Sequence, residues 1–295
     1  MTLKRQIFVY CLHTIKSCTR GLSSKSKGMD VESVHKTAQE GFKQGDHYDR
    51  NRPSYSDELA AHVIKSLHGG DHKDTQYDIL ELGAGTGKFT RKILEALKGL
   101  PKMRYIASEP SEGFLSVLRQ QSPTVETLVG SAMKIPLPEQ SVMNVICAQS
   151  FHWFATKESL AEIQRVLVPG GRLVLVWNDK DWNIEWLRKL EDVLTLYYDD
   201  TPRKITGKWK NVFDGCPSFR CVEHRHLAGI TGMKGDKNFV LNHFTSISVI
   251  ARLDPQQRQE ALEKFKAVLD EAFTDDEEID IPFKSDFYCT EKIVS

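Results

Sequence analysis

Three glycines at every second position mark the part of the chain that is best suited to hold a ligand. Gly83, Gly85 and Gly87 stand in the stretch YDILELGAGTGKFT, after an apolar run and before residues that favour a helix. Glycines in such a turn let the backbone approach a ligand closely and adopt positive φ angles at little cost. The acidic Glu81 precedes the turn and Lys88 follows it. The pattern predicts a turn that binds a nucleoside-containing ligand.

The spacing of these glycines separates the ligands that use such turns. A phosphate-binding loop reads GxxxxGK[ST], but the interval from Gly83 to Gly87 is one residue too short, and Phe89 stands where a magnesium-binding hydroxyl is needed. A dinucleotide turn reads GxGxxG, but Gly87 comes one residue early and Lys88 occupies the expected place. A nucleoside triphosphate is therefore disfavoured, and NAD fits less well.

Strands and helices alternate around this turn. The predicted strands are YDILEL, MRYIAS, VETLVG, SVMNVICAQS and RLVLVW. The helices between them include SEGFLSVLRQQ, which Ser111 caps, and TKESLAEIQRVL, which Thr156 caps and VPGG closes. Apolar strands separated by helices of this length pair in parallel, with helices on both faces. This order predicts a doubly wound, Rossmann-like α/β sheet.

The pattern changes beyond residue 180. NIEWLRKLEDVLTLYY and PQQRQEALEKFKAVLDEAF are predicted to be helices, and we expect them to cover the cleft. FRCVEHRHL and KSDFYCTEKI alternate as partly exposed strands do, and we expect them to pair antiparallel at the sheet edge. The predicted fold is a seven-stranded sheet, mostly parallel with an antiparallel edge strand, under a helical cover.

Composition limits the classes of partner. The 40 basic and 40 acidic residues leave no formal net charge, whereas nucleic-acid binders usually carry a basic excess. The six cysteines form no CxxC pair, which predicts free thiols in a reducing compartment and no metal site. No apolar run approaches the roughly 18 residues that span a bilayer. We expect a soluble protein, and the sequence leaves its oligomeric state open.

The first 29 residues differ from the rest of the chain. They contain basic residues and serines but no acidic residue before Asp30, which is typical of a mitochondrial transit peptide. Alternatively, the protein begins at Met29. We treat residues 1–29 as an extension and residues 30–295 as a single domain with its core at about residues 77–180. The expected location is cytoplasmic, or mitochondrial if residues 1–29 act as a transit peptide.

These motifs, in their order, resemble those of the class I S-adenosylmethionine-dependent methyltransferases. ELGAGTG resembles the first motif of the family, and YIASEP ends the second strand in an acidic residue. GSAMKIPLPEQSVMNVICAQSFHWF resembles the later motifs, and EIQRVLVPGGRLVLVW resembles the turn into strand five. HYDRNRPSY and SFHWFA further resemble the type 11-like, small-molecule branch that includes trans-aconitate methyltransferase-like proteins. The four main features span roughly residues 77–177.

The resemblance implies S-adenosylmethionine as the cofactor and assigns residues to it. Gly83, Gly85 and Gly87 would let the backbone approach the methionine and ribose part. Glu81 would help to hold the amino group of the cofactor. Glu109 would bridge both ribose hydroxyls, because a carboxylate can accept from two hydroxyl donors at once.

The resemblance also places residues beside the adenine and the methionine. Ser131 and Ala132 would lie beside the adenine ring, and Gln149 would line the methionine end. Ser131 departs from the acidic residue of many relatives, so its hydroxyl or the Ala132 backbone would accept from the adenine amino group. As alternatives, Ser131 would be only a turn residue, and the Glu81 carboxylate would only accept hydrogen bonds from neighbouring backbone amides.

The acceptor side is expected to come from QSFHWFA and HYDRNRPSY. His152 is the only residue of the first group that exchanges a proton near neutral pH, as a general base or a donor to substrate, unless it only packs beside Trp153. Trp153 and Phe154 form an apolar wall or part of the core. Arg52 would bind a carboxylate, with a surface salt bridge as the alternative, and Tyr48 would close the pocket.

Two absent motifs bear on the methyl acceptor. No [DN]PP[FY] motif follows the fourth strand, which disfavours methylation of an adenine or glutamine amino group by the arrangement that uses this motif. No Pro-Cys pair follows it either, which disfavours the covalent mechanism of cytosine methylation with a thiolate nucleophile. The sequence therefore predicts an enzyme that methylates a small molecule, on a carboxylate or a hydroxyl. The alternatives are a protein or RNA methyltransferase, and a catalytically silent protein of the same fold that binds the cofactor or a partner protein.

Overall fold

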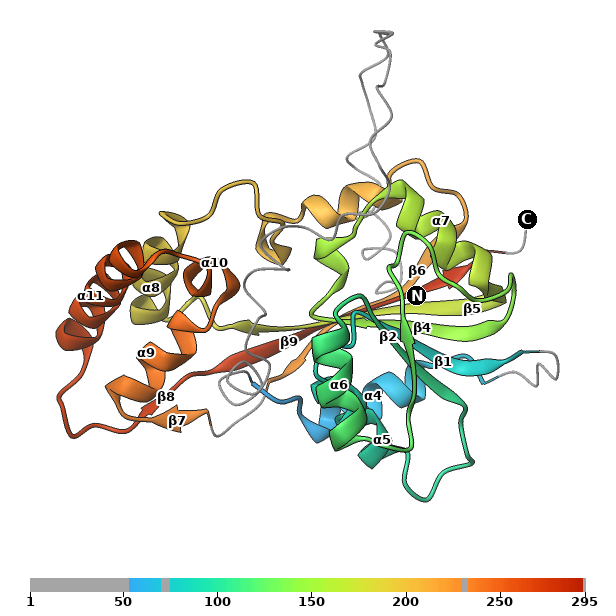
Figure 1. Cartoon of the computed structure of the whole chain (residues 1–295), viewed down its shortest axis with the longest axis horizontal. Coiled ribbons are helices and arrows are strands. Elements are labelled where there is room, and N and C mark those ends of the chain that lie inside the picture. The colour runs from blue at the N-terminus through green and yellow to red at the C-terminus, as the bar shows by residue number, and fades with distance from the viewer. Residues whose placement is uncertain (1–52, 70–74, 230–232, 294–295) are drawn as a thin grey trace, which may run out of the picture. The chain divides into compact units, whose positions relative to one another are not determined.

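A computed structural model describes residues 53–69, 75–229 and 233–293 of the protein (Figure 1). The elements that form the sheet and its flanking layers are α4 (Asp57–Ser66), β1 (Tyr77–Leu82), α5 (Lys88–Ala96), β2 (Tyr105–Glu109), α6 (Glu112–Gln121), β3 (Glu126–Val129), β4 (Val142–Ala148), the 3₁₀ helix η1 (Phe151–Trp153), α7 (Lys157–Val166) and β5 (Leu167–Lys180). The later elements are α8 (Glu185–Thr195), the 3₁₀ helices η2 (Lys204–Thr206) and η3 (Lys208–Phe213), β6 (Phe219–Ala228), β7 (Lys234–Gly235), α9 (Lys237–Thr245), α10 (Ser248–Ala251), α11 (Pro255–Ala272), β8 (Ile279–Asp280) and β9 (Phe283–Lys292).

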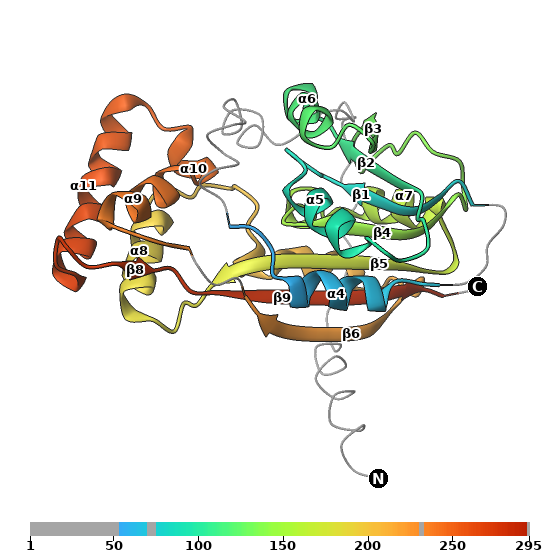
Figure 2. The same ribbon diagram turned by 90° about the horizontal axis from the view of Figure 1, so that it is seen from below.

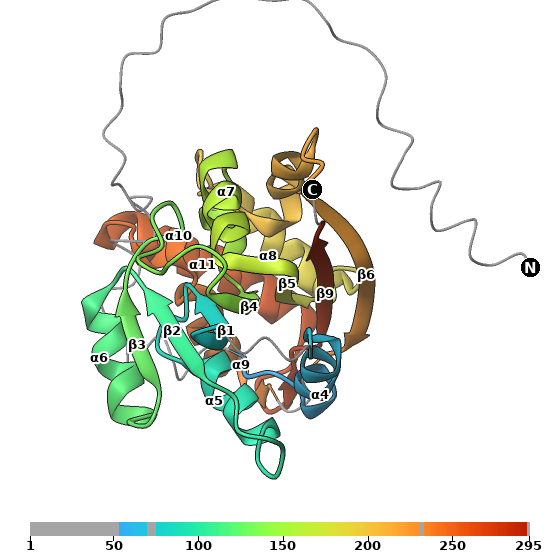
Figure 3. The same ribbon diagram turned by 90° about the vertical axis from the view of Figure 1, so that its right-hand side faces the viewer.

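Seven strands form one sheet in the order β3, β2, β1, β4, β5, β9, β6. The first five pair in parallel, and β9 runs antiparallel to β5 and β6. The predicted seven-stranded sheet is confirmed, and the two late strands pair antiparallel as expected. The antiparallel strand lies one place inside the edge, and β6 is outermost (Figure 3). The strand order reverses between β1 and β4, which is where sheets of this kind bind ligands.

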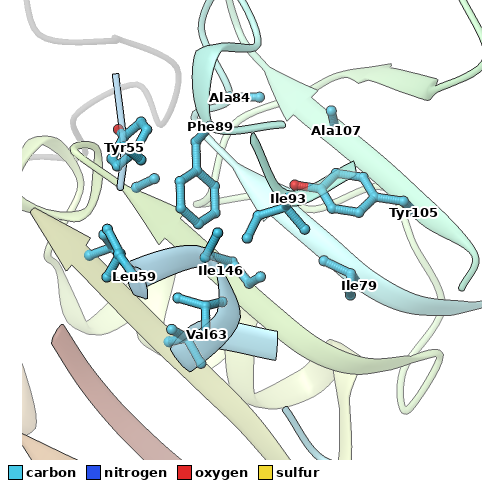
Figure 4. Close-up of a cluster of buried hydrophobic side chains, with 14 of the residues drawn as sticks. Tyr55, Leu59, Val63, Ile79, Ala84, Phe89, Ile93, Tyr105, Ala107 and Ile146 are labelled. Atoms are coloured by element: carbon cyan, nitrogen blue, oxygen red, sulfur yellow. The ribbon is translucent and has the colours of Figure 1, made fainter. Parts of the chain in front are cut away.

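One face of the sheet packs against α4, α5 and α6. Leu59 and Val63 of α4 meet Phe89 and Ile93 of α5 above Ile79 of β1, and all five side chains are buried (Figure 4). Their spacing of four residues places each pair on one side of its helix. This layer fixes α5 against the sheet and so fixes the glycine turn that leads into α5.

The opposite face packs against α7 and η3. Leu80 and Cys147 point to this side and join Leu160 of α7 and Trp209 of η3 in a second core cluster. Successive strand residues point to opposite faces, which is why neighbouring residues of β1 lie in different clusters. Cys147 is a buried free thiol among apolar side chains, as predicted. Helices cover both faces, so the doubly wound architecture is confirmed.

The predicted helix caps are present, whereas strand five differs from the prediction. The Ser111 hydroxyl accepts from the Phe114 amide at 3.4 Å, and the Thr156 hydroxyl accepts from the Ser159 amide at 3.2 Å. VPGG was predicted to close α7 before the strand, but β5 already begins at Leu167. The register of β5 against β4 shifts across these residues, because Gly170 takes a φ of +75°.

The helices α8, α9, α10 and α11 lie together at one end of the sheet (Figure 2). Their buried side chains belong to a third cluster. Glu191 and Leu194 of α8 line the cleft described below. The expected helical cover therefore holds for α8 but not for α11, because the buried side chains of α11 pack against α8 and α9 instead. His243 of α9 and Ser248 of α10 line the cleft in its place.

Several predictions concern residues that the structure does not describe. The division at residue 29, Tyr48 and Arg52 all lie outside the described residues. None of the helices in the described part of the chain combines the length and the apolar character that crossing a bilayer requires.

Candidate functional site

A cleft of about 570 Å³ opens at the carboxyl ends of β1, β2, β4 and β5. Seven of the eight residues predicted to bind the cofactor line it: Glu81, Gly83, Gly85, Glu109, Ser131, Ala132 and Gln149. His152 and Trp153 line it as well. The fold thus brings together side chains that are up to 72 residues apart, from Glu81 to Trp153.

The three glycines of the turn all have positive φ angles, but they have different structural roles. The angles are +69° at Gly83, +58° at Gly85 and +82° at Gly87. A Cβ atom on Gly83 would lie 2.6 Å from the Ser150 Cβ, and one on Gly87 would lie 2.7 Å from the Leu118 Cγ. A Cβ on Gly85 would meet nothing within 4 Å. Gly85 therefore leaves room for a ligand, whereas the other two let protein segments pack closely.

Gly87 is the one member of the predicted set that does not line the cleft. It precedes α5 in a left-handed conformation and lies against α6 through Leu118. A glycine is needed there because of the backbone conformation and the close helix packing. The sequence pattern alone did not separate Gly87 from the two glycines that line the cleft.

The Glu109 carboxylate is held by the backbone at the end of β2. The Gly85 amide donates to Oε2 at 3.0 Å, and the Ser111 amide donates to Oε1 at 3.1 Å. The side chain is 8 % exposed, and no ion pair among the described residues includes it. Burial raises the pKa of Glu109, while the two amide donors oppose the rise. Each oxygen keeps one lone pair for a further donor, which suits two neighbouring hydroxyls.

Glu81 lies deeper, beneath the glycine turn. Its Oε2 accepts from the Thr90 hydroxyl at 2.5 Å and from the Tyr105 hydroxyl at 2.6 Å. Its partners in the structure are hydroxyls, and not the backbone amides of the alternative prediction. Burial raises the pKa of Glu81 to about 7, although the two hydroxyl donors oppose the rise. A cation that reached this carboxylate would lower its pKa again.

The segment after β3 forms a tight turn at the edge of the cleft. The Ser131 hydroxyl accepts from the Met133 amide at 3.2 Å, and Ala132 is buried at 7 % exposure. Ser131 is therefore part of a turn. A hydroxyl has a second lone pair and one proton, so Ser131 can still contact a ligand in the cleft that it lines.

Gln149 follows β4 in a conformation that side chains seldom adopt. Its φ is +55°, and a non-glycine residue in this region costs roughly 1–3 kcal/mol. Its amide donates to the Val176 carbonyl at 2.8 Å, and its side-chain Nε2 donates to the Asn178 carbonyl at 2.8 Å. These bonds to β5 hold the strained backbone in place. Gln149 therefore positions the ends of β4 and β5 next to each other.

His152 is placed by a tryptophan that the sequence analysis did not connect with it. The Trp177 indole N–H donates to the His152 Nδ1 at 3.1 Å. Indole nitrogen can only donate, so Nδ1 is unprotonated and the neutral ring carries its proton on Nε2. Burial and, to a lesser degree, the Lys204 charge together lower the pKa of His152 to about 3. The geometry thus favours a hydrogen-bond donor and opposes a general base.

The other half of the cleft is built from residues that were not predicted. Lys180 ends β5, and its ammonium lies 4.8 Å from the Phe244 ring and 5.3 Å from the Trp182 ring. Arg203 lies 3.9 Å from the Tyr198 ring. Cations near aromatic faces are attracted by the ring quadrupole. Because β5 is parallel to β4, the carboxyl ends of both strands lie at the same edge of the sheet. The polar residues of WNDK, at the end of the apolar run of β5, were the sequence signal that could have placed Lys180 in the cleft.

Lys204 joins this half of the cleft to the sheet. Its ammonium contacts the Asp179 carboxylate and lies 2.5 Å from the Asp286 Oδ2. Burial alone would lower the pKa of Lys204, but the two carboxylates raise it, so the side chain stays charged. Arg203 has an acidic neighbour as well, with 3.5 Å between its Nη1 and the Glu191 Oε1. Positive and negative groups thus alternate along this wall.

The comparisons with known proteins identify the family of the chain. A family model described as a methyltransferase domain matches residues 80–175. The methyltransferase-like protein C25B8.10 of Schizosaccharomyces pombe is 47% identical over 137 residues, which are 46% of this chain and 52% of that protein. The chain therefore spans only about half the length of that relative.

Two further similarities cover more of the chain. The uncharacterized methyltransferase C25B8.09 of Schizosaccharomyces pombe is 35% identical over 231 residues, which are 76% of this chain and 83% of that protein. The structure of a candidate type II methyltransferase from Anaeromyxobacter dehalogenans has a TM-score of 0.56 at 20% identity, over 82% of this chain and 97% of that one. The chain therefore belongs to the class I S-adenosylmethionine-dependent methyltransferase family.

Proposed function

We propose that the protein transfers a methyl group from S-adenosylmethionine to a small molecule, on a carboxylate or a hydroxyl. One observation carries the proposal: the open Cβ position of Gly85 faces the same cleft as Glu109, whose carboxylate is fixed by two backbone amides. A ribose fits this arrangement because its two hydroxyls can each donate to one carboxylate oxygen. A phosphate does not fit, because the buried carboxylate would repel it.

The cofactor would supply a methyl group on a sulfonium, which needs no activation by the protein. In this proposal Glu109 binds the ribose, Ser131 and Ala132 border the adenine, and Glu81 attracts the amino group. Gln149 fixes the backbone at the end of β4, where the methionine part would lie. The task of the protein is then to hold an acceptor in line with the methyl carbon, which alone can supply much of the rate enhancement.

The acceptor half of the cleft supports a small substrate. The whole cleft measures about 570 Å³, within the range of roughly 300–1,000 Å³ that is typical of small-molecule sites. Trp153 and Phe154 border it, as does Trp182. Lys180, Arg203 and Lys204 line this half together with Asp179 and Glu191. The presence of these three cations in the cleft supports an acceptor that bears a carboxylate.

Substitution of Gly85 tests the position of the cofactor. We expect Gly85→Ala to fold and to bind S-adenosylmethionine about tenfold more weakly or worse, because the methyl group would occupy ligand space. Gly99→Ala is the matched control, since Gly99 also has a positive φ, +82°, and an open Cβ position, but does not line the cleft. Calorimetry on both variants makes the comparison. Equal affinities in the two variants would contradict this placement of the cofactor.

Substitution of His152 tests its role as a donor. We expect His152→Ala to slow turnover more than it weakens cofactor binding, and His152→Gln to keep more activity because an amide offers both an acceptor and a donor. Because His152 stays neutral above about pH 3, we expect no change in rate from its titration between about pH 5 and pH 8. If the rate of the wild type rose with pH through a pKa near 6.5, and the His152 variants lacked this rise, His152 would act as a general base.

The acceptor itself can be found directly. The protein is incubated with a labelled-methyl cofactor and a metabolite extract, and the labelled product is identified by mass spectrometry. Label on a compound with a carboxylate or hydroxyl supports the proposal. A parallel incubation with a cell extract that retains protein and RNA covers the alternatives. Label on either polymer would replace the proposal with a polymer-modifying enzyme, and binding of the cofactor without any transfer would indicate a catalytically silent protein. The Glu109→Ala variant serves as the control without cofactor binding.

A further inference from the structure

Two histidines lie side by side on the outermost strand of the sheet. His224 and His226 are two residues apart on β6, and side chains at this spacing on a strand point to the same face. Asp286 of the neighbouring strand β9 lies opposite His226 in the register, and Tyr288 lies opposite His224. The two strands are neighbours at the sheet edge (Figure 3). Three groups with metal-binding atoms therefore converge on one patch.

The distances within this cluster suit a metal ion. The Asp286 Oδ1 lies 2.8 Å from the His224 Nε2 and 3.4 Å from the His226 Nδ1. All three atoms lie within 4.8 Å of one another. Bonds of about 2.0–2.2 Å to a tetrahedral zinc ion place ligand atoms roughly 3.4 Å apart. The two Asp286 distances differ from this value by about 0.6 Å or less, and rotation of the exposed imidazole rings would adjust the distance between the two histidine nitrogens.

The neighbours of the cluster hold two of the three groups in place. The His224 ring stacks on the Tyr288 ring, with centroids 3.9 Å apart and planes at 8°. Asp286 is 4 % exposed, and Lys204 contacts its Oδ2 at 2.5 Å, which leaves Oδ1 toward the histidines. Partners that orient ligating side chains in this way are typical of metal sites.

The charge around the cluster is close to balanced. Asp286 is its one carboxylate, and the Lys204 ammonium contacts the oxygen of Asp286 that does not face His224. The cluster therefore favours a metal ion through its ligand types, two imidazole nitrogens and one carboxylate oxygen, and not through a net negative charge.

We infer that His224, His226 and Asp286 form a binding site for a divalent transition metal, with zinc as the favoured ion. Two imidazoles and one carboxylate are a ligand set that zinc uses with a water molecule in the fourth position. Calcium and magnesium prefer sites built from oxygen ligands alone, so they are not expected here. No metal site was predicted from the sequence, because the cysteines form no CxxC pair and the histidines of this cluster are far from its carboxylate along the chain, with 60 positions between His226 and Asp286.

The test uses the full chain after treatment with a chelator. Titration with zinc chloride, followed by calorimetry, should show one strong site, and His226→Gln and His224→Gln should each weaken it by about tenfold or more. The two histidine side chains are 69 % and 38 % exposed, so both variants should fold. His68→Gln removes an imidazole elsewhere in the chain and should bind zinc as the wild type does.

Two results would overturn the inference. One is equal zinc affinity in the wild type and in His226→Gln. The other is an absorption spectrum of the cobalt-substituted protein that shows thiolate ligation, because it would place the metal at cysteines. Binding of S-adenosylmethionine should be the same with and without zinc, since Glu109 and Glu81 lie outside this cluster. Failure of zinc binding would therefore reject the metal site alone, and failure of S-adenosylmethionine binding would reject the proposed function alone.

Discussion

Replacement of Glu109 by alanine is expected to weaken S-adenosylmethionine binding by about 100-fold or more. Each hydrogen bond to a charged group contributes roughly 1.5–3 kcal/mol to the binding free energy, and in the proposed site the Glu109 carboxylate accepts two such bonds from the ribose. The variant also loses the acceptor of the Gly85 and Ser111 amides, which disturbs the turn that borders the ligand. Both effects act on the cofactor, whereas the core clusters on the two faces of the sheet do not include Glu109.

Calorimetry on the folded variant measures this loss, and Glu112→Ala is the matched control. Glu112 is three positions further along the chain, is exposed and pairs with Arg119, so the same change of charge should leave affinity unchanged. A cofactor analogue that lacks one ribose hydroxyl sharpens the test. The wild type should bind this analogue less tightly than the parent compound, whereas Glu109→Ala should bind the two compounds with equal affinity. Wild-type affinity in Glu109→Ala would show that the ribose lies elsewhere.

Replacement of Glu81 by glutamine is expected to stabilise the protein at neutral pH and to weaken cofactor binding. The folded protein holds the Glu81 proton more tightly than the unfolded chain does, because burial raises the pKa from 4.5 to about 7. The stability that this carboxyl contributes is fully present below about pH 4.5 and is lost as the pH rises through 7. The loss amounts to roughly 3 kcal/mol. Glutamine has no proton to lose, so its stability should not fall in this window.

Thermal unfolding at several pH values measures the first effect. Glu81→Gln should be more stable than the wild type near pH 8 and about equal to it near pH 4.5. Glu95→Gln makes the same change at an exposed position that pairs with Lys98, and it should shift stability by less than about 0.5 kcal/mol. A Glu81→Gln variant that is less stable than the wild type near pH 8 would contradict the unfavourable burial of this carboxylate.

The second effect concerns the amino group of the cofactor. A positive charge beside Glu81 would lower its pKa, so binding should release a proton and grow tighter as the pH rises from about 5 to 7. In Glu81→Gln this pH dependence should vanish, and affinity should fall about 10- to 100-fold because the charged partner is gone. An unchanged pH dependence in the variant would assign the effect to another group.

The part of the cleft around the glycine turn was largely readable from the sequence. Glycines at fixed spacing after an apolar strand and an acid at the end of the next strand are local signals, and parallel pairing of β1 with β2 brings Gly85 and Glu109 together. The helix caps at Ser111 and Thr156 were local signals too. Gly87 shows the limit of this reasoning, because its contact with Leu118 depends on how α6 packs.

The acceptor half could not be predicted in the same way. Lys204 enters the cleft only because carboxylates from β5 and β9 hold it, and no pattern near Lys204 announces those partners. The protonation of His152 depends on Trp177, which lies 25 residues further along the chain. The cluster of His226 and Asp286 depends on the register of two strands. Contacts of this kind follow from tertiary packing, which a single sequence does not encode in any short motif.

Titration of the folded wild-type protein with four compounds tests the central claim most directly. By calorimetry, S-adenosylmethionine and S-adenosylhomocysteine should each bind at one site per chain, whereas ATP and NAD should not bind. That result would show that the turn after β1 and the carboxylate at the end of β2 accept an adenosyl thioether or sulfonium and reject a phosphate. Binding of ATP or NAD, with no heat from the first two compounds, would contradict the account.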